Sequence, residues 1–313
     1  MKSVLSFAAL SFAALSGLTA AAQEPKIYRD AEQAFLERTS LRAADEKCKY
    51  FTDLERSALI SGQLQSRGVL LRAGFDSADI DKAADEVRLY ANTQPCGSAD
   101  FMAARSHLKN AFSAFIGTMV MDYPGVDTVW SASRSRWDTW RVVQNGSHQA
   151  FPYQFGLLAP VLTDPDAFPA KFARPLDAPL QTDPFQLALE IILPKDMQVP
   201  SLARILLRDE MKSPAPWLGT IFGNEPGPPP HALTKAYWAS GRELIEDEKT
   251  GERKLRFSFS PATTAAIEKL DPRERFQIAI TPNARSTSSE IIYLEIEVGD
   301  FAAAHAFTKL PPL

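Results

Sequence analysis

The change of fold falls at residues 121–126, which read MDYPGV. Before this stretch, apolar residues recur with helical spacing, and Pro124-Gly125 is typical of a helix stop. After it, prolines become frequent and short β-type runs alternate with turns. We therefore expect an α+β protein in which a helical bundle at 23–125 precedes a mainly antiparallel, β-sandwich-like domain at 126–313.

Working backward from Pro124, the last helix of the bundle carries an apolar stripe that runs from Phe101 to Met119. Ser98 is placed to cap its first turn, and Ser77 is placed to cap the helix before it.

The second helix has the clearest start in the sequence. Thr52-Asp53-Leu54-Glu55 fits a capping box, in which the threonine and glutamate side chains satisfy each other's backbone N–H groups. Gly74 is suited to end this helix, and an earlier helix over 30–44 completes the bundle.

The chain has two cysteines, Cys48 and Cys96. Each lies just before a predicted helix, the second and the fourth. Short loops make consecutive helices antiparallel, so both cysteines fall at the same end of the bundle. We expect a disulfide, provided that the chain is exported to an oxidising compartment; two free thiols are the alternative.

Working forward from residue 126, the strands are expected to pair antiparallel, with a helix at 262–270 that Ser260-Pro261 begins. The predicted strands are 139–144, 154–158, 185–193, 203–208, 255–260, 276–281 and 290–298.

The N-terminus has the three parts of a secretory signal: Lys2, an apolar run from Val4 to Leu18, and the small residues Ala20-Ala21-Ala22. Cleavage after Ala22 is expected, with an uncleaved membrane anchor as the alternative. The next most apolar run, at 111–121, is too short to span a bilayer. The mature protein is therefore predicted to be periplasmic or secreted.

Composition excludes several classes of function. A net charge of −4 gives no footprint for nucleic acid. The two cysteines and four histidines show no metal-ligand spacing, so no metal site is expected. The sequence has neither a nucleophile elbow nor a glycine-rich phosphate loop, so we predict no cofactor.

Two short patterns match those of penicillin-binding proteins and β-lactamases. Ser106-His107-Leu108-Lys109 fits S-x-x-K, and Lys249-Thr250-Gly251 fits K-T-G. The second pattern lies in a charged run that is typical of a hairpin turn, whereas these families need it on a strand, so we do not assign that activity. Asp164 and Asp166 lack the remaining oxygens of a calcium loop.

Tryptophan and arginine are concentrated where the two predicted domains meet. Both residue types are enriched at binding hot spots. The side chains could instead fill the inter-domain core, and the sequence leaves both interpretations open. The candidate binding residues are Trp130, Arg134, Arg136, Trp137, Trp140 and Arg141, and a second aromatic group comprises Trp217, Tyr237 and Trp238.

Several stretches together resemble a set of exported bacterial proteins of unknown activity. The similarity covers mainly the helical half and implies an exported two-cysteine domain, with no known catalytic residues. The stretches that carry it are 48–52, 65–68, 71–74, Cys96-Gly97, Ala111-Phe112, 121–125 and the spacing of Trp130 and Arg134.

These observations favour a non-enzymatic binding or envelope-accessory module, whose partner would be an envelope protein or a glycan. An anionic polymer is a further possible ligand of the tryptophans and arginines. The alternative is a periplasmic hydrolase whose site is assembled from distant residues of the β-rich domain, such as His148 or His231 with neighbouring carboxylates.

Overall fold

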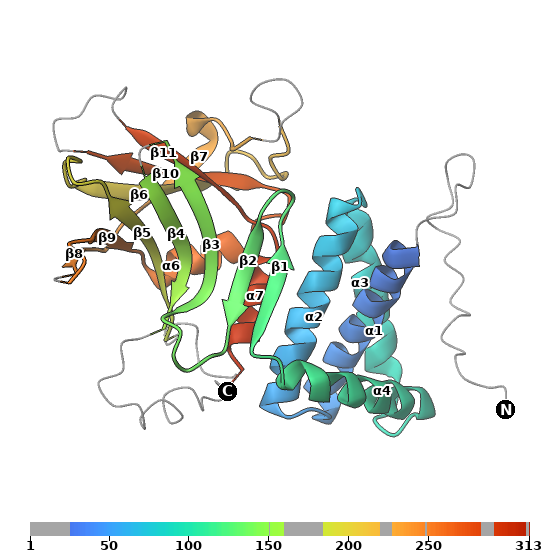
Figure 1. Ribbon diagram of the computed structural model, residues 1–313. Helices are drawn as coiled ribbons and strands as arrows, with labels where there is room; N and C mark the ends of the chain where they lie inside the picture. The colour runs from blue at the N-terminus through green and yellow to red at the C-terminus, as the bar shows by residue number, and fades with distance from the viewer. Residues whose placement is uncertain are drawn as a thin grey trace.

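The computed structural model describes residues 26–149, 151–159, 184–219, 227–247, 249–282, 291–310 and 313. It confirms the α+β class, because helices occupy the N-terminal part and antiparallel sheets follow (Figure 1). The predicted signal peptide, Asp164 and Asp166 lie outside the described residues.

The helical part begins with α1 (Lys26–Cys48), α2 (Asp53–Arg72), α3 (Ser77–Thr93) and α4 (Ala99–Ile116). The capping box of Thr52 and Glu55 is present, and Ser98 caps α4 through the backbone N–H of Phe101. The cap predicted for Ser77 is wrong. Asp76 caps α3 instead, because its carboxylate accepts a hydrogen bond from the N–H of Ala78.

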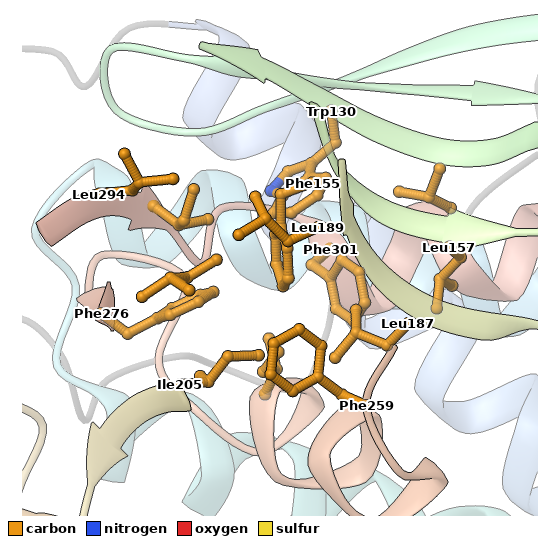
Figure 2. Packing of buried hydrophobic residues seen from close by; sticks show 14 of the residues in the cluster. Trp130, Phe155, Leu157, Leu187, Leu189, Ile205, Phe259, Phe276, Leu294 and Phe301 are labelled. Carbon is orange, nitrogen blue, oxygen red and sulfur yellow. The ribbon is translucent and has the colours of Figure 1, made fainter. Parts of the chain in front are cut away.

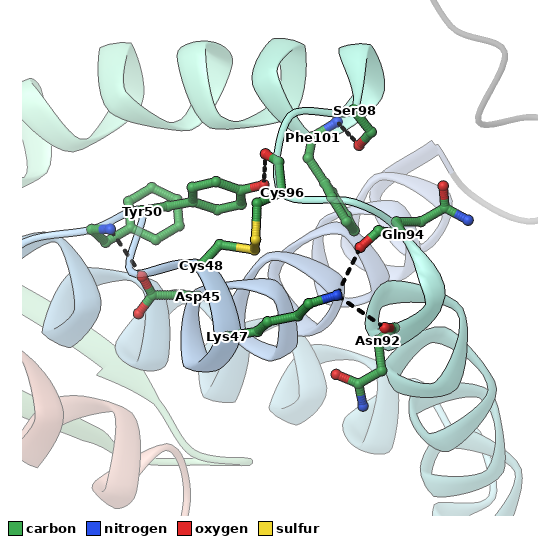
Figure 3. Close-up of a disulfide and its surroundings, with 10 residues drawn as sticks. Asp45, Lys47, Cys48, Tyr50, Asn92, Gln94, Cys96, Ser98 and Phe101 are labelled. Carbon is green, nitrogen blue, oxygen red and sulfur yellow. Dashed lines mark hydrogen bonds between the residues drawn. A yellow bond between two sulfur atoms is a disulfide. The ribbon is translucent and has the colours of Figure 1, made fainter.

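The disulfide between Cys48 and Cys96 is formed and joins the end of α1 to the turn before α4 (Figure 3). Neighbouring contacts hold the same junction. The Tyr50 hydroxyl donates to the carbonyl of Cys96, and Lys47 Nζ donates to the carbonyls of Asn92 and Gln94 at 3.4 and 3.2 Å. The prediction that both cysteines lie at one end of the bundle is confirmed.

The described strands form two antiparallel sheets. One has the order β1-β2-β3-β4-β5-β9-β8 and the other β11-β10-β6-β7. The bounds are β1 (Val120–Pro124), β2 (Val129–Ser133), β3 (Trp140–His148), β4 (Phe151–Leu158), β5 (Gln186–Leu193), β6 (Leu202–Arg208), β7 (Thr234–Trp238), β8 (Gly241–Glu246), β9 (Arg253–Ser258), β10 (Arg275–Thr281) and β11 (Ile292–Glu297).

Each of the seven predicted strands is present within a few residues of its predicted bounds, whereas β1, β2, β7 and β8 were not predicted. The predicted helix is α6 (Pro261–Glu268), and a further helix, α7 (Phe301–Thr308), ends the fold. A single turn of 3-10 helix spans His231–Leu233.

The predicted end of the fourth helix is also wrong. The helix stops at Ile116, and residues 120–124 form a strand that pairs with β2, with Tyr123 opposite Trp130. Pro124-Gly125 therefore starts a hairpin turn instead of ending a helix, and Gly125 donates to the carbonyl of Thr128 at 2.7 Å. A proline is tolerated here because it ends an edge strand.

The inner faces of both sheets share one hydrophobic core with α6 and α7 (Figure 2). Phe155 of β4 lies 5.8 Å from Phe276 of β10, measured between ring centroids, and Trp130 of β2 lies 4.9 Å from Phe301 of α7. The contact between Phe155 and Phe276 joins the two sheets, as in the sandwich-like arrangement that the alternating sequence pattern predicts.

Helix α7 connects the two parts of the protein, because it lies between the sheet and α2 (Figure 1). Ser61 of α2 donates to the carbonyl of Ala303 at 2.9 Å, and the buried Asp300 accepts two hydrogen bonds from Arg72 at 2.7 and 2.8 Å. Burial raises the pKa of Asp300, and Arg72 opposes that shift. A Cβ at Gly68 would overlap the Asp300 carboxylate, so glycine is required for this close approach.

A second polar contact fastens the β1–β2 turn to the core. The buried carboxylate of Glu297 accepts hydrogen bonds from the backbone N–H groups of Val126, Asp127 and Thr128 and from the Thr128 hydroxyl. Arg275 also donates to it at 2.6 Å. This carboxylate thus replaces the strand partners that the turn lacks.

Candidate functional site

The six tryptophan and arginine residues predicted as a binding surface separate into buried and exposed sets. Trp130, Arg134 and Arg141 are at most 2% exposed, and Trp140 is half-buried. Arg136 and Trp137 are exposed and lie in the connection between β2 and β3. The structure therefore brings all six into one region but leaves two of them on its surface.

Trp130 belongs to the core because its strand turns it inward. Its neighbours Val129 and Ser131 face away, as the two-residue period of a strand requires. The indole Nε1–H donates to the carbonyl of Val298 at 2.9 Å, which satisfies the polar atom of a buried tryptophan.

Arg134 supports the base of the connection. Its Nη1 donates to the carbonyls of Ile116 and Thr118, at 2.5 and 3.1 Å, where α4 ends and leaves carbonyls without helical partners. Its guanidinium lies 5.5 Å from the ring centroid of Phe307 in α7. Burial lowers the pKa of Arg134, yet the group stays charged at neutral pH because its ordinary value is so high.

Arg141 holds the connection from the other side, through hydrogen bonds from Nη1 to the carbonyls of Ser133 and Ser135. Within the connection, the Ser133 hydroxyl bonds the Asp138 carboxylate, and the Ser135 hydroxyl accepts from the N–H of Trp137 at 3.2 Å. Such serine and aspartate bonds to nearby groups fix a turn without a regular ladder.

The result is a braced connection, residues 134–139, that presents Trp137 with 82% of its surface exposed. Other exposed apolar side chains lie beside it. The carbonyl of Met119 accepts from the N–H of Arg134 at 2.8 Å, Val120 pairs with Ser133, and these two side chains are 48% and 51% exposed. We call Met119, Val120, Arg136 and Trp137 the tryptophan patch.

The second aromatic group lies elsewhere. Tyr237 and Trp238 are on β7, an edge strand of the other sheet, with the Arg204 guanidinium 5.1 Å from the centroid of the Trp238 ring. Figure 1 places β7 at the upper end of the molecule and the β2–β3 connection at the lower end. Tyr237 and Trp238 therefore do not share one surface with Trp137.

The two histidines named for a hydrolase site contact an amide and aromatic rings. His231 hydrogen-bonds Gln277 at 3.2 Å and lies 5.2 Å from the Tyr293 ring, and His148 lies 5.6 Å from the Phe151 ring. Lys249-Thr250-Gly251 forms the turn between β8 and β9, as predicted, because Asp247 accepts from the N–H groups of Lys249 and Thr250.

A histidine–carboxylate pair that the sequence did not reveal joins α6 and α7. His305 Nδ1 lies 2.6 Å from Glu268 Oε1, and the imidazole is 1% exposed between the rings of Phe185 and Phe301. The two residues are far apart in the sequence, so no motif could have identified them. Burial of the ring between aromatic side chains suits packing better than contact with a substrate.

Comparisons with protein-family models, with curated proteins and with solved structures found no match. The resemblance to exported two-cysteine proteins therefore stays a prediction. Among the described residues, no group of three or more histidine, cysteine, aspartate or glutamate side chains could hold a metal ion. No described helix has the length and apolarity needed to cross a membrane.

The tryptophan patch can bind but has no group placed for acid, base or nucleophilic chemistry. It offers an indole face for stacking or apolar burial, a guanidinium with forked donors, and two aliphatic side chains. The connection is braced before any ligand arrives, which lowers the ordering entropy that binding would otherwise cost.

Proposed function

We propose that the protein is an exported, non-enzymatic binding module that engages an envelope protein through the tryptophan patch. The observation that carries this proposal is the 82% exposure of Trp137 on a connection that the buried, hydrogen-bonded Arg134 and Arg141 hold in place. In that position a large apolar side chain adds nothing to the stability of the fold, whereas its burial by a partner would stabilise the complex.

The composition of the patch favours a protein over a glycan. Met119 and Val120 are apolar and exposed beside the start of the connection, and methionine, tryptophan and arginine are all enriched at protein interfaces. A sugar ring would use the indole face and polar donors but would leave the aliphatic side chains uncovered. A glycan is the second ligand that the experiment below distinguishes.

Export is part of the same proposal. The basic, apolar and small-residue segments of residues 1–22 support it, and so does the formed Cys48–Cys96 disulfide, since structural disulfides persist in oxidising compartments. We place the mature protein in the periplasm or outside the cell.

A hydrolase is the alternative function, and the pair of Glu268 and His305 is the observation in its favour, because a carboxylate-oriented imidazole is the arrangement of a general base. Its burial favours a structural role. Loss of hydrolysis of generic ester substrates in a His305→Gln variant that keeps its fold would revive this alternative.

The binding proposal predicts that Trp137→Ala removes a partner without disturbing the fold. Crosslinking in cells followed by purification of the tagged mature protein should recover a stoichiometric envelope protein with the wild type. Trp137→Ala should reduce its recovery at least tenfold, the loss expected for a hot-spot tryptophan. The free energy of unfolding of the variant should change by no more than about 0.5 kcal/mol, as for other surface positions.

Trp238→Ala is the matched control, because Trp238 is also exposed, at 53%, but lies on β7. It should retain the partner. Arg134→Ala is unsuitable because it would leave carbonyls at the end of α4 without a donor. Equal recovery with both tryptophan variants contradicts the proposal, and retention on a glycan resin that depends on Trp137 would replace the protein partner with a sugar.

A further inference from the structure

A cleft of about 490 Å³ opens between the end of α1, the start of α2 and α7, and it shares no residue with the tryptophan patch. Small-molecule sites have volumes in this range. Its charged lining residues come from both ends of the chain and are Arg42, Asp45, Glu46, Lys49, Arg56 and Lys309.

The lining of the cleft carries a net positive charge, whereas the protein as a whole is negatively charged. Four cationic side chains face two carboxylates, which leaves two excess positive charges in a chain of net charge −4. Arg56 is already engaged, because it donates to Asp45, Asp53 and the carbonyl of Phe51. The hydrogen bond to Asp45 is the main cause that raises the pKa of Arg56.

Three other cations remain available to a ligand. Arg42 donates from Nη1 to Gln63 at 3.1 Å, which leaves the other donors of its guanidinium. For Lys49 and Lys309, no hydrogen bond or ion pair of the ammonium group is found among the described residues. The three cations come from α1, the turn after α1 and the end of α7, so they approach the cleft from different sides.

The backbone at Lys49 gives an independent indication. Its φ of 53° is left-handed, and it is the single non-glycine residue of the described chain with a positive φ. Its N–H caps α1 by donating to the carbonyl of Asp45 at 2.9 Å, a position where glycine is the relaxed choice. Lys47 already supplies the basic residue of the last turn of α1, so the helix dipole does not require a second lysine there.

The remaining lining is a hydroxyl and an apolar floor, from Ser57, Ile60 and Ala306. Cations at the rim and aliphatic groups below suit an anion with an apolar tail. We propose that the cleft binds a small organic oxyanion, either a phosphate monoester or a carboxylate with a short aliphatic chain, held by Arg42, Lys49 and Lys309.

Isothermal titration of the mature protein with hexyl phosphate, hexanoate and hexanol tests this proposal. Saturable binding is expected for at least one of the two anions and not for hexanol, with affinity that falls as sodium chloride is raised. The preferred anion distinguishes a phosphate from a carboxylate ligand. Trp137→Ala should bind the anion as the wild type does, since the patch and the cleft are separate.

Two variants locate the site. Lys49→Gly and Lys309→Met should each weaken binding of the anion roughly tenfold, the effect of one partly exposed charged contact. Lys49→Gly should also keep or raise the melting temperature, because glycine relaxes the left-handed backbone. Lys82→Met, an exposed lysine of α3 outside the cleft, is the control and should bind normally.

A purely structural role for these lysines predicts the opposite pattern. If neither anion gives saturable binding, or if Lys49→Gly and Lys309→Met bind the anion as tightly as Lys82→Met does, the proposed site is rejected.

Discussion

Glu297→Ala is expected to lower the free energy of unfolding by about 3–5 kcal/mol, the cost of removing one partner from a buried ion pair. The side chain is 2% exposed and accepts hydrogen bonds from three backbone N–H groups of the β1–β2 turn and from Arg275. Its loss removes the acceptor of the three backbone N–H groups and leaves Arg275 with Asp127 as its remaining carboxylate partner. Urea unfolding followed by circular dichroism measures the change.

Glu295→Ala is the matched control, because Glu295 lies on the same strand but is exposed, and its substitution should change stability by no more than about 0.5 kcal/mol. A loss of less than about 1 kcal/mol for Glu297→Ala would mean that water replaces the carboxylate at little cost.

Arg275→Met separates the ion pair from the backbone contacts. With the arginine removed, Glu297 still accepts from Val126, Asp127 and Thr128, so the expected loss is smaller, about 1–2 kcal/mol. Equal losses for Arg275→Met and Glu297→Ala would show that Glu297 stabilises the protein through the ion pair and not through its hydrogen bonds to the turn.

The β1–β2 turn also shows where prediction from sequence failed. Pro124-Gly125 is a correct signal for a break in the chain, but the signal does not say which element the break ends. The strand before it is five residues long and pairs locally with another of five. Gly125 is needed because a Cβ there would overlap the Glu297 carboxylate, which arrives from a strand far along the chain.

The predictable features were those encoded within a few residues. The capping box at Thr52, the cap at Ser98 and the pairing of Cys48 with Cys96 followed from local spacing and from the antiparallel arrangement of short-looped helices. Helix α7 was not predicted, because it is a short helix that packs against α2, and Gly68 and Asp300 meet only after the whole chain has folded.

The sequence located the tryptophan and arginine segment correctly but did not show which of its side chains are buried and which are exposed. The inward direction of Trp130 follows from strand alternation once β2 is known. The burial of Arg134 does not follow from the local sequence, because it depends on the carbonyls that α4 leaves at its end. The exposure of Trp137 could not be predicted either, because it depends on which neighbouring side chains are buried.

The double variant Cys48→Ser/Cys96→Ser is expected to lose about 4 kcal/mol of stability, from the loop entropy that a disulfide with a sequence separation of 48 removes from the unfolded chain. Tyr50 and Lys47 keep their hydrogen bonds across the junction, so the native helices should remain and the unfolded state should change most. Urea unfolding with and without dithiothreitol measures this.

The reductant serves as the internal control for this prediction. Dithiothreitol should destabilise the wild type by the same amount as the double substitution and should leave the double variant unchanged, because the serines provide no bond to reduce. A wild type that resists the reductant while the variant is weakened would assign the loss to packing of Cys48 and Cys96 in the helical core, where both are partly buried. If the reductant and the double substitution cause equal losses, the bundle depends on the disulfide for much of its stability. About 4 kcal/mol is a large share of the free energy of unfolding of a typical domain. A chain of that kind is suited to a compartment in which the bond persists, and the stability measurement therefore also bears on the proposal that the protein is exported.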